Sequence, residues 1–277
     1  MLILAGTPIG NLGDASERLR QTLERAEVIA CEDTRTTAKL LQLLGIDHRP
    51  RLLALHEHNE RDLAREIAEL ASGADVVLVS DAGMPAISDP GYSVVVACHE
   101  AGVTVTAVPG PTAVTTALAL SGLPTDRFVF DGFVPRRAGE RARLIAGLDR
   151  EPRTVILYES PHRLAATLAE FAAAWPERRA AVARELTKLH EEVVRGTVSE
   201  LADWAGAGVR GEIVLLLAGA EPEAADPEAA LDRVHALVAD GMRLKDAAAE
   251  VAAAAGLRKR DLYEAALAAR SGAEPRR

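Results

Sequence analysis

The stretch SDAGMPAISDPG, residues 80–91, separates two segments with different structural preferences. The residues before it, DVVLVS (75–80), form a short apolar run typical of a strand buried on both faces. The residues after it, SVVVACHEAG (93–102), favour a helix. A connection from a strand to a helix needs only about two to six residues. This one has twelve, with two aspartates, two prolines and two glycines, so we expect it to bind a ligand as well as connect.

Strands and helices alternate on both sides of this stretch through the first 122 residues. Apolar runs predict strands at 1–6, 28–32, 51–56, 75–80 and 103–109. Amphipathic segments predict helices at 16–27, 36–45, 59–73, 93–102 and 112–122. This alternation is typical of a mostly parallel sheet covered by helices on both faces. We therefore expect an α/β domain over residues 1–122, which ends where Gly122 and Pro124 break the pattern.

A second α/β domain is expected over residues 123–220. Its predicted strands are 128–133, 153–160, 179–186 and 211–219, and its predicted helices are 139–149, 162–175 and 198–208. An acidic, proline-containing linker follows. Short helical patterns then predict a small helical domain over residues 226–277, compatible with a helix-turn-helix arrangement.

Composition narrows the class of protein. No apolar run reaches the roughly 18 residues that a membrane-spanning helix needs, so we expect no membrane partner. The two cysteines, Cys31 and Cys98, lie inside predicted apolar elements, as expected of reduced thiols in the cytoplasm. His56 and His58 could ligate a metal, but a polar strand end explains them better, and we expect no metal site. The net charge of -9 by itself argues against a nucleic-acid partner.

The usual phosphate-binding and hydrolase motifs are absent, since the chain has no GxGxxG, no GxxxxGK[ST] and no GxSxG. Unusual loops instead follow three predicted parallel strands. These loops are GTPIGNLGDAS (6–16), SDAGMPAISDPG (80–91) and VPGPTAV (108–114). The carboxyl edge of a parallel sheet is where ligands bind, so three such loops together predict a ligand site.

Three polar clusters also end predicted strands: CEDTRTT (31–37), YESPHR (158–163) and ARELTKLHEE (183–192). Each by itself is explained by a local ion pair or a helix cap. Together they would surround a cleft between two α/β domains, which is a preferred location for ligands.

These loops and clusters, with GEIVLLL (211–217), closely resemble in their order the bacterial small-subunit rRNA methyltransferase I family. The resemblance extends over essentially the whole chain. It implies the tetrapyrrole-methylase fold, with two α/β domains of mixed and parallel sheets and a small C-terminal helical domain. It also implies transfer of a methyl group from S-adenosylmethionine to the ribose 2′-OH of the cytidine at position 1402 of 16S rRNA. The implied partner is 16S rRNA or the 30S subunit, and the implied enzyme is cytoplasmic and homodimeric.

The resemblance also implies which residues bind the cofactor. They are Pro8, Gly10, Asp81, Ala82, Gly83, Ile87, Pro109, Gly110, Pro111 and Thr112. Within SDAGMPAISDPG we expect residues 81–87 to touch the cofactor and residues 89–91 to begin the next helix. Two alternatives remain open: a methyltransferase of the same fold that acts on a tetrapyrrole or another small molecule, and a nucleic-acid-binding regulator that senses the cofactor.

The chemistry predicts a base and a cationic partner, because a ribose hydroxyl is a weak nucleophile at neutral pH. We expect Glu159 as the base, with Lys188 or Arg184 as the electrostatic partner. Glu32, Asp33 and Arg35 form the second candidate set.

Local basic segments qualify the acidic net charge, since positive patches on an acidic body still bind phosphates. They contain the residues that we expect to contact RNA: Arg136, Arg137, Arg141, Arg258, Lys259 and Arg260.

Overall fold

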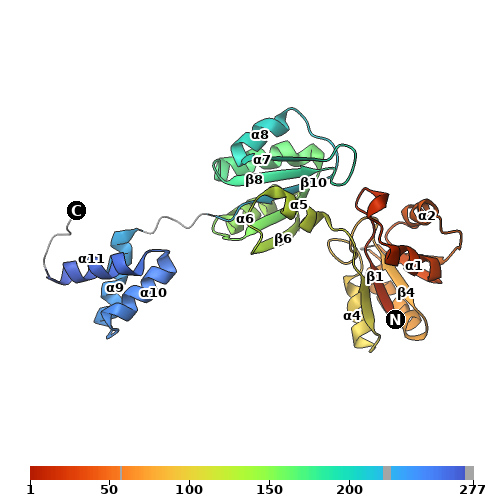
Figure 1. The fold of residues 1–277 in the computed structure, drawn as a ribbon, viewed down its shortest axis with the longest axis horizontal. Helices are drawn as coiled ribbons and strands as arrows, with labels where there is room; N and C mark the ends of the chain where they lie inside the picture. Colours follow the sequence, from red (N-terminus) through yellow and green to blue (C-terminus); the bar gives the residue numbers. More distant parts are fainter. Residues whose placement is uncertain (57, 221–225, 272–277) are drawn as a thin grey trace. The chain divides into compact units, whose positions relative to one another are not determined.

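The computed structural model describes residues 1–56, 58–220 and 226–271. The chain divides after Gly219 into two compact units, Met1–Gly219 and Ala220–Arg277. Figure 1 shows their helices and strands, with labels where there is room. The end of the expected third domain, residues 272–277, lies outside the described residues. No helix in the described part of the chain is long and apolar enough to span a bilayer.

The first sheet has five parallel strands in the order β3-β2-β4-β1-β5. The strands are β1 (Leu2–Ala5), β2 (Val28–Cys31), β3 (Arg51–Ala54), β4 (Val76–Val79) and β5 (Val105–Val108). All five were predicted from their apolar runs. β4 lies at the centre and all four of its residues are buried, so the strand that precedes SDAGMPAISDPG is covered on both faces as expected.

Helices cover both faces of this sheet because successive strand residues point to opposite sides. Val76 and Leu78 pack in one core with α3 (Glu60–Gly73) and α4 (Tyr92–Glu100). The alternate residues of β4 pack in another core with α1 (Glu17–Arg25) and α2 (Thr34–Leu43). Ser16 caps α1 by accepting a hydrogen bond from Leu19 N–H, as predicted.

The second sheet is mixed, with the order β6-β7-β10-β8-β9. Its strands are β6 (Phe128–Phe133), β7 (Thr154–Glu159), β8 (Arg179–Arg184), β9 (Glu192–Thr197) and β10 (Ile213–Leu217). Only β6 and β7 pair in parallel. The sequence prediction missed β9, because this edge strand is only half buried and lacks an apolar run. Helices α6 (Ala138–Leu148), α7 (Pro161–Ala174) and α8 (Val198–Gly206) each contribute to the core on one face.

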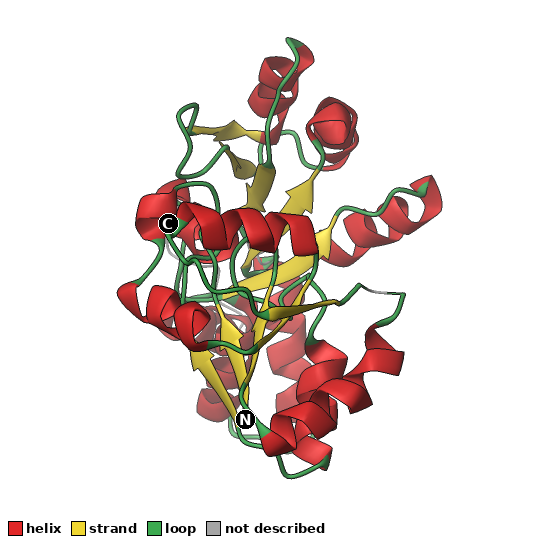
Figure 2. Cartoon of the chain, turned by 90° about the vertical axis from the view of Figure 1, so that its right-hand side faces the viewer, coloured by secondary structure: helices red, strands yellow, loops and turns green. Residues whose placement is uncertain are grey.

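The other face of the second sheet is covered by α5 (Ala113–Ser121), which the sequence assigned to the first domain. Val114, Ala117 and Leu118 of α5 share a core with Ile156 of β7 and Leu216 of β10. The boundary at residue 122 therefore follows the alternation of elements along the chain, whereas packing joins both sheets into one unit. Helices flank the strands in Figure 2.

The second unit is a small helical bundle. Its helices are α9 (Pro227–Ala239), α10 (Leu244–Ala255) and α11 (Lys259–Ser271). They share an apolar core that includes Val234, Ala247 and Leu262. Gly256 ends α10 in the left-handed conformation, as its position in the sequence predicted.

Candidate active site

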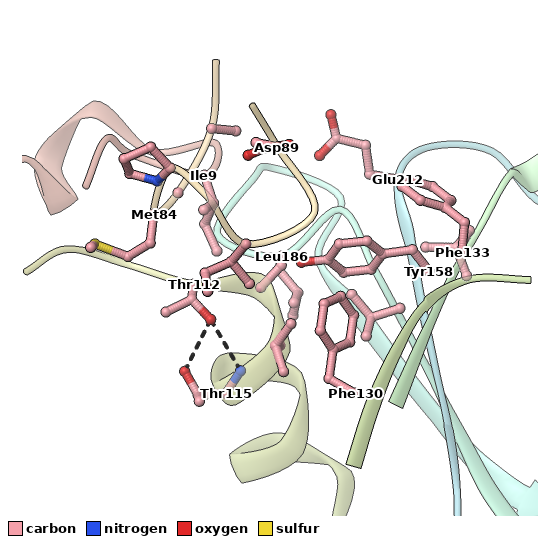
Figure 3. Close-up of a pocket in the computed structure, with 18 of the residues that line it drawn as sticks. Ile9, Met84, Asp89, Thr112, Thr115, Phe130, Phe133, Tyr158, Leu186 and Glu212 are labelled. Carbon is pink, nitrogen blue, oxygen red and sulfur yellow. Dashed lines mark hydrogen bonds between the residues drawn. The ribbon is translucent and has the colours of Figure 1, made fainter. Parts of the chain in front are cut away.

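A cavity of about 1270 Å³ lies within the first unit, at the carboxyl edge of the first sheet. Residues from the loops of the first sheet and from strands of the second line it, among them Ile9, Thr112, Phe130 and Tyr158. Figure 3 shows these side chains pointing toward the same space. Pockets for single small ligands are usually about 300–1,000 Å³, so this cavity has room for a cofactor and part of an acceptor.

SDAGMPAISDPG forms one wall of the cavity and has an unusual backbone. Gly83 and Gly91 have φ angles of 87° and 140°. Two residues with side chains, Ala86 and Ser88, also lie in the left-handed region, at 68° and 64°. Such residues cost free energy and persist where the surrounding structure holds them, commonly at ligand sites.

Thr7 connects this loop to the loop after β1. Thr7 N–H donates to the Gly83 carbonyl (2.9 Å) and Gly83 N–H donates back to the Thr7 carbonyl (3.2 Å). The Thr7 hydroxyl, which is buried, donates to the Ser80 carbonyl (3.2 Å). The two loops therefore behave as one piece.

The PGP turn approaches the first loop through two glycines. A Cβ on Gly110 would lie 2.6 Å from the carbonyl oxygen of Gly6, and a Cβ on Gly6 would lie 2.7 Å from the Gly110 backbone. Both contacts are closer than real Cβ atoms make, so the sequence needs glycine at both places for backbone packing.

Asp89, which the sequence interpretation assigned to the start of a helix, lines the cavity. It does not cap α4, whose N-cap is Gly91. Burial, aided by the nearby carboxylates of Glu32 and Asp81, raises the pKa of Asp89 to about 6. Asp81 does not line the cavity; its carboxylate accepts a hydrogen bond from Asp33 N–H (3.2 Å). The expectation that residues 89–91 begin the next helix is therefore wrong for Asp89, whereas binding of the cofactor by residues 81–87 stays a prediction.

Glu159 lines the cavity, but other groups occupy its carboxylate. The residue is only 3% exposed. Oε1 accepts hydrogen bonds from Ser160 N–H (2.6 Å) and from the Arg163 guanidinium, and Oε2 accepts one from the Thr167 hydroxyl (2.6 Å). These contacts favour a structural role, and the assignment of Glu159 as a base stays a prediction.

Lys188 lies beside the cavity rather than on its wall. Its Nζ forms ion pairs of 3.0 Å with Glu185 and with Glu212, which both line the cavity. Partial burial lowers the pKa of Lys188, but hydrogen bonds to these two carboxylates outweigh it and leave that pKa raised. Its aliphatic stem crosses Gly10, where a Cβ would lie 2.5 Å from Lys188 Cγ.

The residue that precedes Lys188, Thr187, has a strained backbone conformation. Thr187 has a φ of 67°, which is unusual for a β-branched residue, and its buried hydroxyl has no hydrogen-bond partner in the described part of the chain. Arg184, in contrast, is the last residue of β8, is held by Glu192 of β9 (2.6 Å) and does not line the cavity.

The second candidate set lies outside the cavity wall. Asp33 caps α2 and pairs with the exposed side chain of Arg35 at 2.7 Å, and hydrogen bonds from Arg35 lower the pKa of Asp33. Glu32 accepts a hydrogen bond from Asp81 N–H (3.3 Å). This cluster therefore braces the start of SDAGMPAISDPG. No group of three metal-ligating side chains occurs among the described residues.

Four of the residues expected to bind the cofactor line the cavity, namely Ala82, Gly83, Ile87 and Thr112. The other six belong to the same three loops but do not line the cavity: Pro8, Gly10, Asp81, Pro109, Gly110 and Pro111. The sequence interpretation missed Asp89 and the aromatic side chains of β6 and β7. The signal was present in FVFDGF (128–133), whose aromatic residues were interpreted only as strand formers.

The arginines expected to contact RNA divide into two kinds. Arg136 and Arg137 are exposed, whereas Arg141 donates to Glu170 (2.6 and 2.5 Å) and to the carbonyls of Pro135 and Arg136. Arg141 therefore holds the backbone that carries the other two. In the second unit, Arg258 and Arg260 are exposed and pair with acidic side chains on the same helix, and Lys259 is also exposed.

Comparison with known families identifies both units. Residues 1–202 match the family model of Tetrapyrrole (Corrin/Porphyrin) Methylases. Residues 224–270 match the model described as the RsmI C-terminal HTH domain.

Solved structures of this fold resemble the chain at low sequence identity. A diphthine synthase has a TM-score of 0.62 at 16% identity, covering 79% of this chain and 90% of its own. A Thermus thermophilus uroporphyrin-III C-methyl transferase, solved with S-adenyl homocysteine, has a TM-score of 0.54 at 19% identity, covering 78% of this chain and 96% of its own. They show the fold.

Curated relatives match almost the full length. The ribosomal RNA small subunit methyltransferase I of Mycobacterium tuberculosis is 48% identical, covering 97% of this chain and 95% of its own. The Escherichia coli O157:H7 enzyme of the same name is 44% identical, covering 96% and 94%. The chain thus belongs to the ribosomal RNA small subunit methyltransferase I family of tetrapyrrole methylases, which confirms the fold and the methyltransferase activity expected from its sequence.

Proposed function

We propose that this methyltransferase transfers a methyl group from S-adenosylmethionine to the ribose 2′-OH of a cytidine in 16S rRNA of the small ribosomal subunit. The observation that carries the proposal is the extent of the match. The alignments with relatives named for the small-subunit rRNA cover 96–97% of this chain, including the C-terminal unit. The structural matches with the diphthine synthase and the uroporphyrin-III C-methyl transferase cover only 78–79% of it.

The cavity suits S-adenosylmethionine. This cofactor carries no phosphate, which agrees with the absence of a phosphate-binding motif. Ile9, Ile87 and Leu186 offer an apolar wall for the adenine, and the backbone of Ala82 offers polar groups for the rest of the molecule. When bound, S-adenosylmethionine supplies an activated methyl group on a sulfonium sulfur.

Asp89 is our proposed base. Its carboxylate faces the cavity and has a pKa near the range in which a base exchanges protons readily. It would take the proton of the ribose hydroxyl as that oxygen attacks. Glu159 remains the candidate from the sequence, but three donors already occupy its two oxygens.

Lys188 is the better placed of the two proposed cationic partners. It contacts Glu185 and Glu212 at the cavity wall, whereas Arg184 is committed to Glu192. Lys188 would stabilise negative charge that develops on the attacking oxygen. The set Glu32, Asp33 and Arg35 is better suited to positioning the loop that carries Asp89.

Phosphate contacts are assigned to exposed cations. We place Arg136 and Arg137 near the reaction centre, and Arg258, Lys259 and Arg260 on the helical unit, for which the match to a helix-turn-helix family gives support. We also propose that the enzyme acts as a homodimer in the cytoplasm, and that residues 1–122, 123–220 and 226–277 are its domains.

A filter-binding assay with radiolabelled S-adenosylmethionine tests the substrate. Purified 30S subunits that lack the modification should become labelled, whereas a precorrin offered at the same concentration should not. Labelling of the precorrin alone would favour the small-molecule alternative. Cofactor binding without labelling of either acceptor would favour the regulator.

A further inference from the structure

Aromatic side chains gather at one place in this chain. The sequence has four phenylalanines, three tyrosines and two tryptophans, so aromatic residues are scarce. Three of the phenylalanines and two of the tyrosines nevertheless line the active-site cavity: Tyr92, Phe128, Phe130, Phe133 and Tyr158. Phe130 and Tyr158 also pack against the core beneath α5, whereas no core of the first unit includes Tyr92, Phe128 or Phe133 among its described members.

These five side chains form an inner pair and an outer group. The rings of Phe130 and Tyr158 are 4.9 Å apart and meet edge to face. Phe133 packs against Tyr158 with ring centroids 5.2 Å apart and planes at 62°, yet 61% of Phe133 is exposed. Figure 3 shows the three rings on one side of the cavity. Tyr92 and Phe128 are also exposed, so the cavity has an apolar rim that the protein leaves uncovered.

The backbone that follows Phe133 is held firmly. Val134 N–H donates to the Tyr158 carbonyl (3.0 Å), and the Val134 carbonyl accepts from Arg163 (2.8 Å), which is itself held by buried Glu159. Arg141 binds the next two carbonyls. Arg141 and Arg163 therefore fix the backbone between Phe133 and Arg136 through hydrogen bonds to its carbonyls. Glu159 contributes by accepting a hydrogen bond from Arg163.

Arg136 adds a positive charge to the segment that follows this ring. It follows Phe133 by three residues and is exposed, and its guanidinium makes no hydrogen bond or ion pair within the described residues. A free cation beside an exposed aromatic ring is the combination with which proteins bind single-stranded nucleic acid, through a base on the ring and a phosphate on the cation.

We propose that Phe133 is a stacking platform for an unpaired nucleobase of the RNA substrate, with Arg136 on the adjacent phosphate. This inference rests on the proposed function and identifies the residues that would recognise the acceptor. An enzyme that modifies a nucleotide must bring it out of the helical stack, and an aromatic face offsets the stacking that the base loses. The buried network of Glu159 and Arg163 then has a positioning role.

Two other occupants of the rim are physically possible. The adenine of the cofactor would suit the half-buried rings of Phe130 and Tyr158 better than the exposed Phe133, because a more enclosed slot removes more surface from water. A second copy of the chain could cover an apolar rim, but an unpaired arginine beside it is better matched by phosphate.

Steady-state methylation of unmodified 30S subunits by full-length Phe133→Leu and Phe133→Trp tests the proposal. We expect Phe133→Leu to lower kcat/KM on the order of 10- to 100-fold, the loss expected for one base stack, and Phe133→Trp to stay within a few fold of wild type. Leu43→Ala, which removes an exposed apolar side chain of α2 away from the cavity, is the control.

Three further readouts separate the outcomes. Calorimetric affinity for S-adenosylmethionine should be unchanged in Phe133→Leu, and a parallel loss would assign the ring to the cofactor and overturn the proposal. Sedimentation should show an unchanged oligomeric state, and dissociation with full activity per molecule would assign the rim to a second copy. Equal kcat/KM for wild type and Phe133→Leu would also overturn it. Wild-type protein that leaves 30S subunits unlabelled would instead refute the proposed function, and this inference with it.

Discussion

At the scale of single residues, Asp89 shows how one carboxyl acquires properties that its neighbours lack. Asp33 is paired with Arg35, and its pKa falls, whereas Asp89 is partly buried among other carboxylates, and its pKa rises to about 6. The sequence could not distinguish them, because both follow a strand and precede a helix. Only the folded loop, with Ala86 and Ser88 in the left-handed region, turns Asp89 toward the cavity.

The pH dependence of methyl transfer tests the role of Asp89. A base with a pKa of about 6 is mostly protonated at pH 5 and mostly ionised at pH 7, so the single-turnover rate should rise across this interval and then level off. Asp89→Asn should lose roughly 10²–10⁴-fold in rate and should no longer show the rise. Glu159→Gln should still show the rise in rate between pH 5 and pH 7. If Asp89→Asn also shows this rise, Glu159 again becomes the candidate base.

The same shift makes a prediction about stability. The pKa of Asp89 is raised from 3.8 to about 6 on folding, so ionisation is disfavoured in the folded protein. The contribution of neutral Asp89 to the free energy of unfolding is fully present below pH 3.8, and it is lost as the pH rises through 6. At pH 8, Asp89→Asn should therefore melt at a higher temperature than wild type. Because solvent screens this partly exposed carboxylate, we expect a gain of roughly 1–2 kcal/mol in the free energy of unfolding.

Calorimetric melting of both proteins at pH 8 and pH 4.5 checks this. The advantage of Asp89→Asn should shrink at the lower pH. Equal melting temperatures at both pH values would show that Asp89 titrates normally and would weaken its assignment as a base.

At the scale of elements, the sequence predicted what depends on local pattern. Apolar runs located all five strands of the first sheet, and Ser16, Gly122 and Gly256 marked helix ends. It could not predict what depends on long-range packing. β9 (Glu192–Thr197) has too little apolar character to stand out, and nothing local reveals that α5 packs on the second sheet.

Glycines test the close approach of the first loop and the PGP turn. Gly110→Ala places a methyl 2.6 Å from the backbone of Gly6, which cannot move without displacing the loop that carries Thr7. We expect a loss of about 1–3 kcal/mol in unfolding free energy, measured by urea titration, and weaker cofactor binding. Gly147→Ala is the matched control, because it lies in α6 with open space around its Cβ and should be neutral or stabilising. Equal stability of the two variants would contradict the packing account.

The segment with Arg136 and Arg137 makes an electrostatic prediction. Replacing both by alanine should weaken binding to 30S subunits and make its salt dependence shallower. The slope of log K against log salt should change by about 0.7–0.9 for each phosphate that the variant no longer neutralises. Binding titrations from about 50 to 200 mM salt measure this slope.

Arg141→Ala is the comparison for this double variant. It should act differently, because it removes the hydrogen bonds to Glu170 and to two backbone carbonyls, and it should lower stability as well. An unchanged slope in the double variant would remove Arg136 and Arg137 from the RNA interface.

At the scale of the whole molecule, the chain combines two units with separate apolar cores. The first unit holds the cavity, and the second is a small bundle with its own core and three consecutive cations, Arg258, Lys259 and Arg260. An overall charge of -9 obscured this distribution, which is why composition alone argued against a nucleic-acid partner. The order of motifs along the chain was more informative than composition, because it carried the family resemblance that the relatives confirmed.

The most direct test of the central claim is mass-spectrometric mapping of methylated nucleotides in 16S rRNA from cells with and without this protein. We predict that one ribose methyl group, on a cytidine, is present with the protein, disappears in its absence and returns when the wild-type chain is supplied, but not with Asp89→Asn. Identical methylation in both kinds of cell would contradict the account.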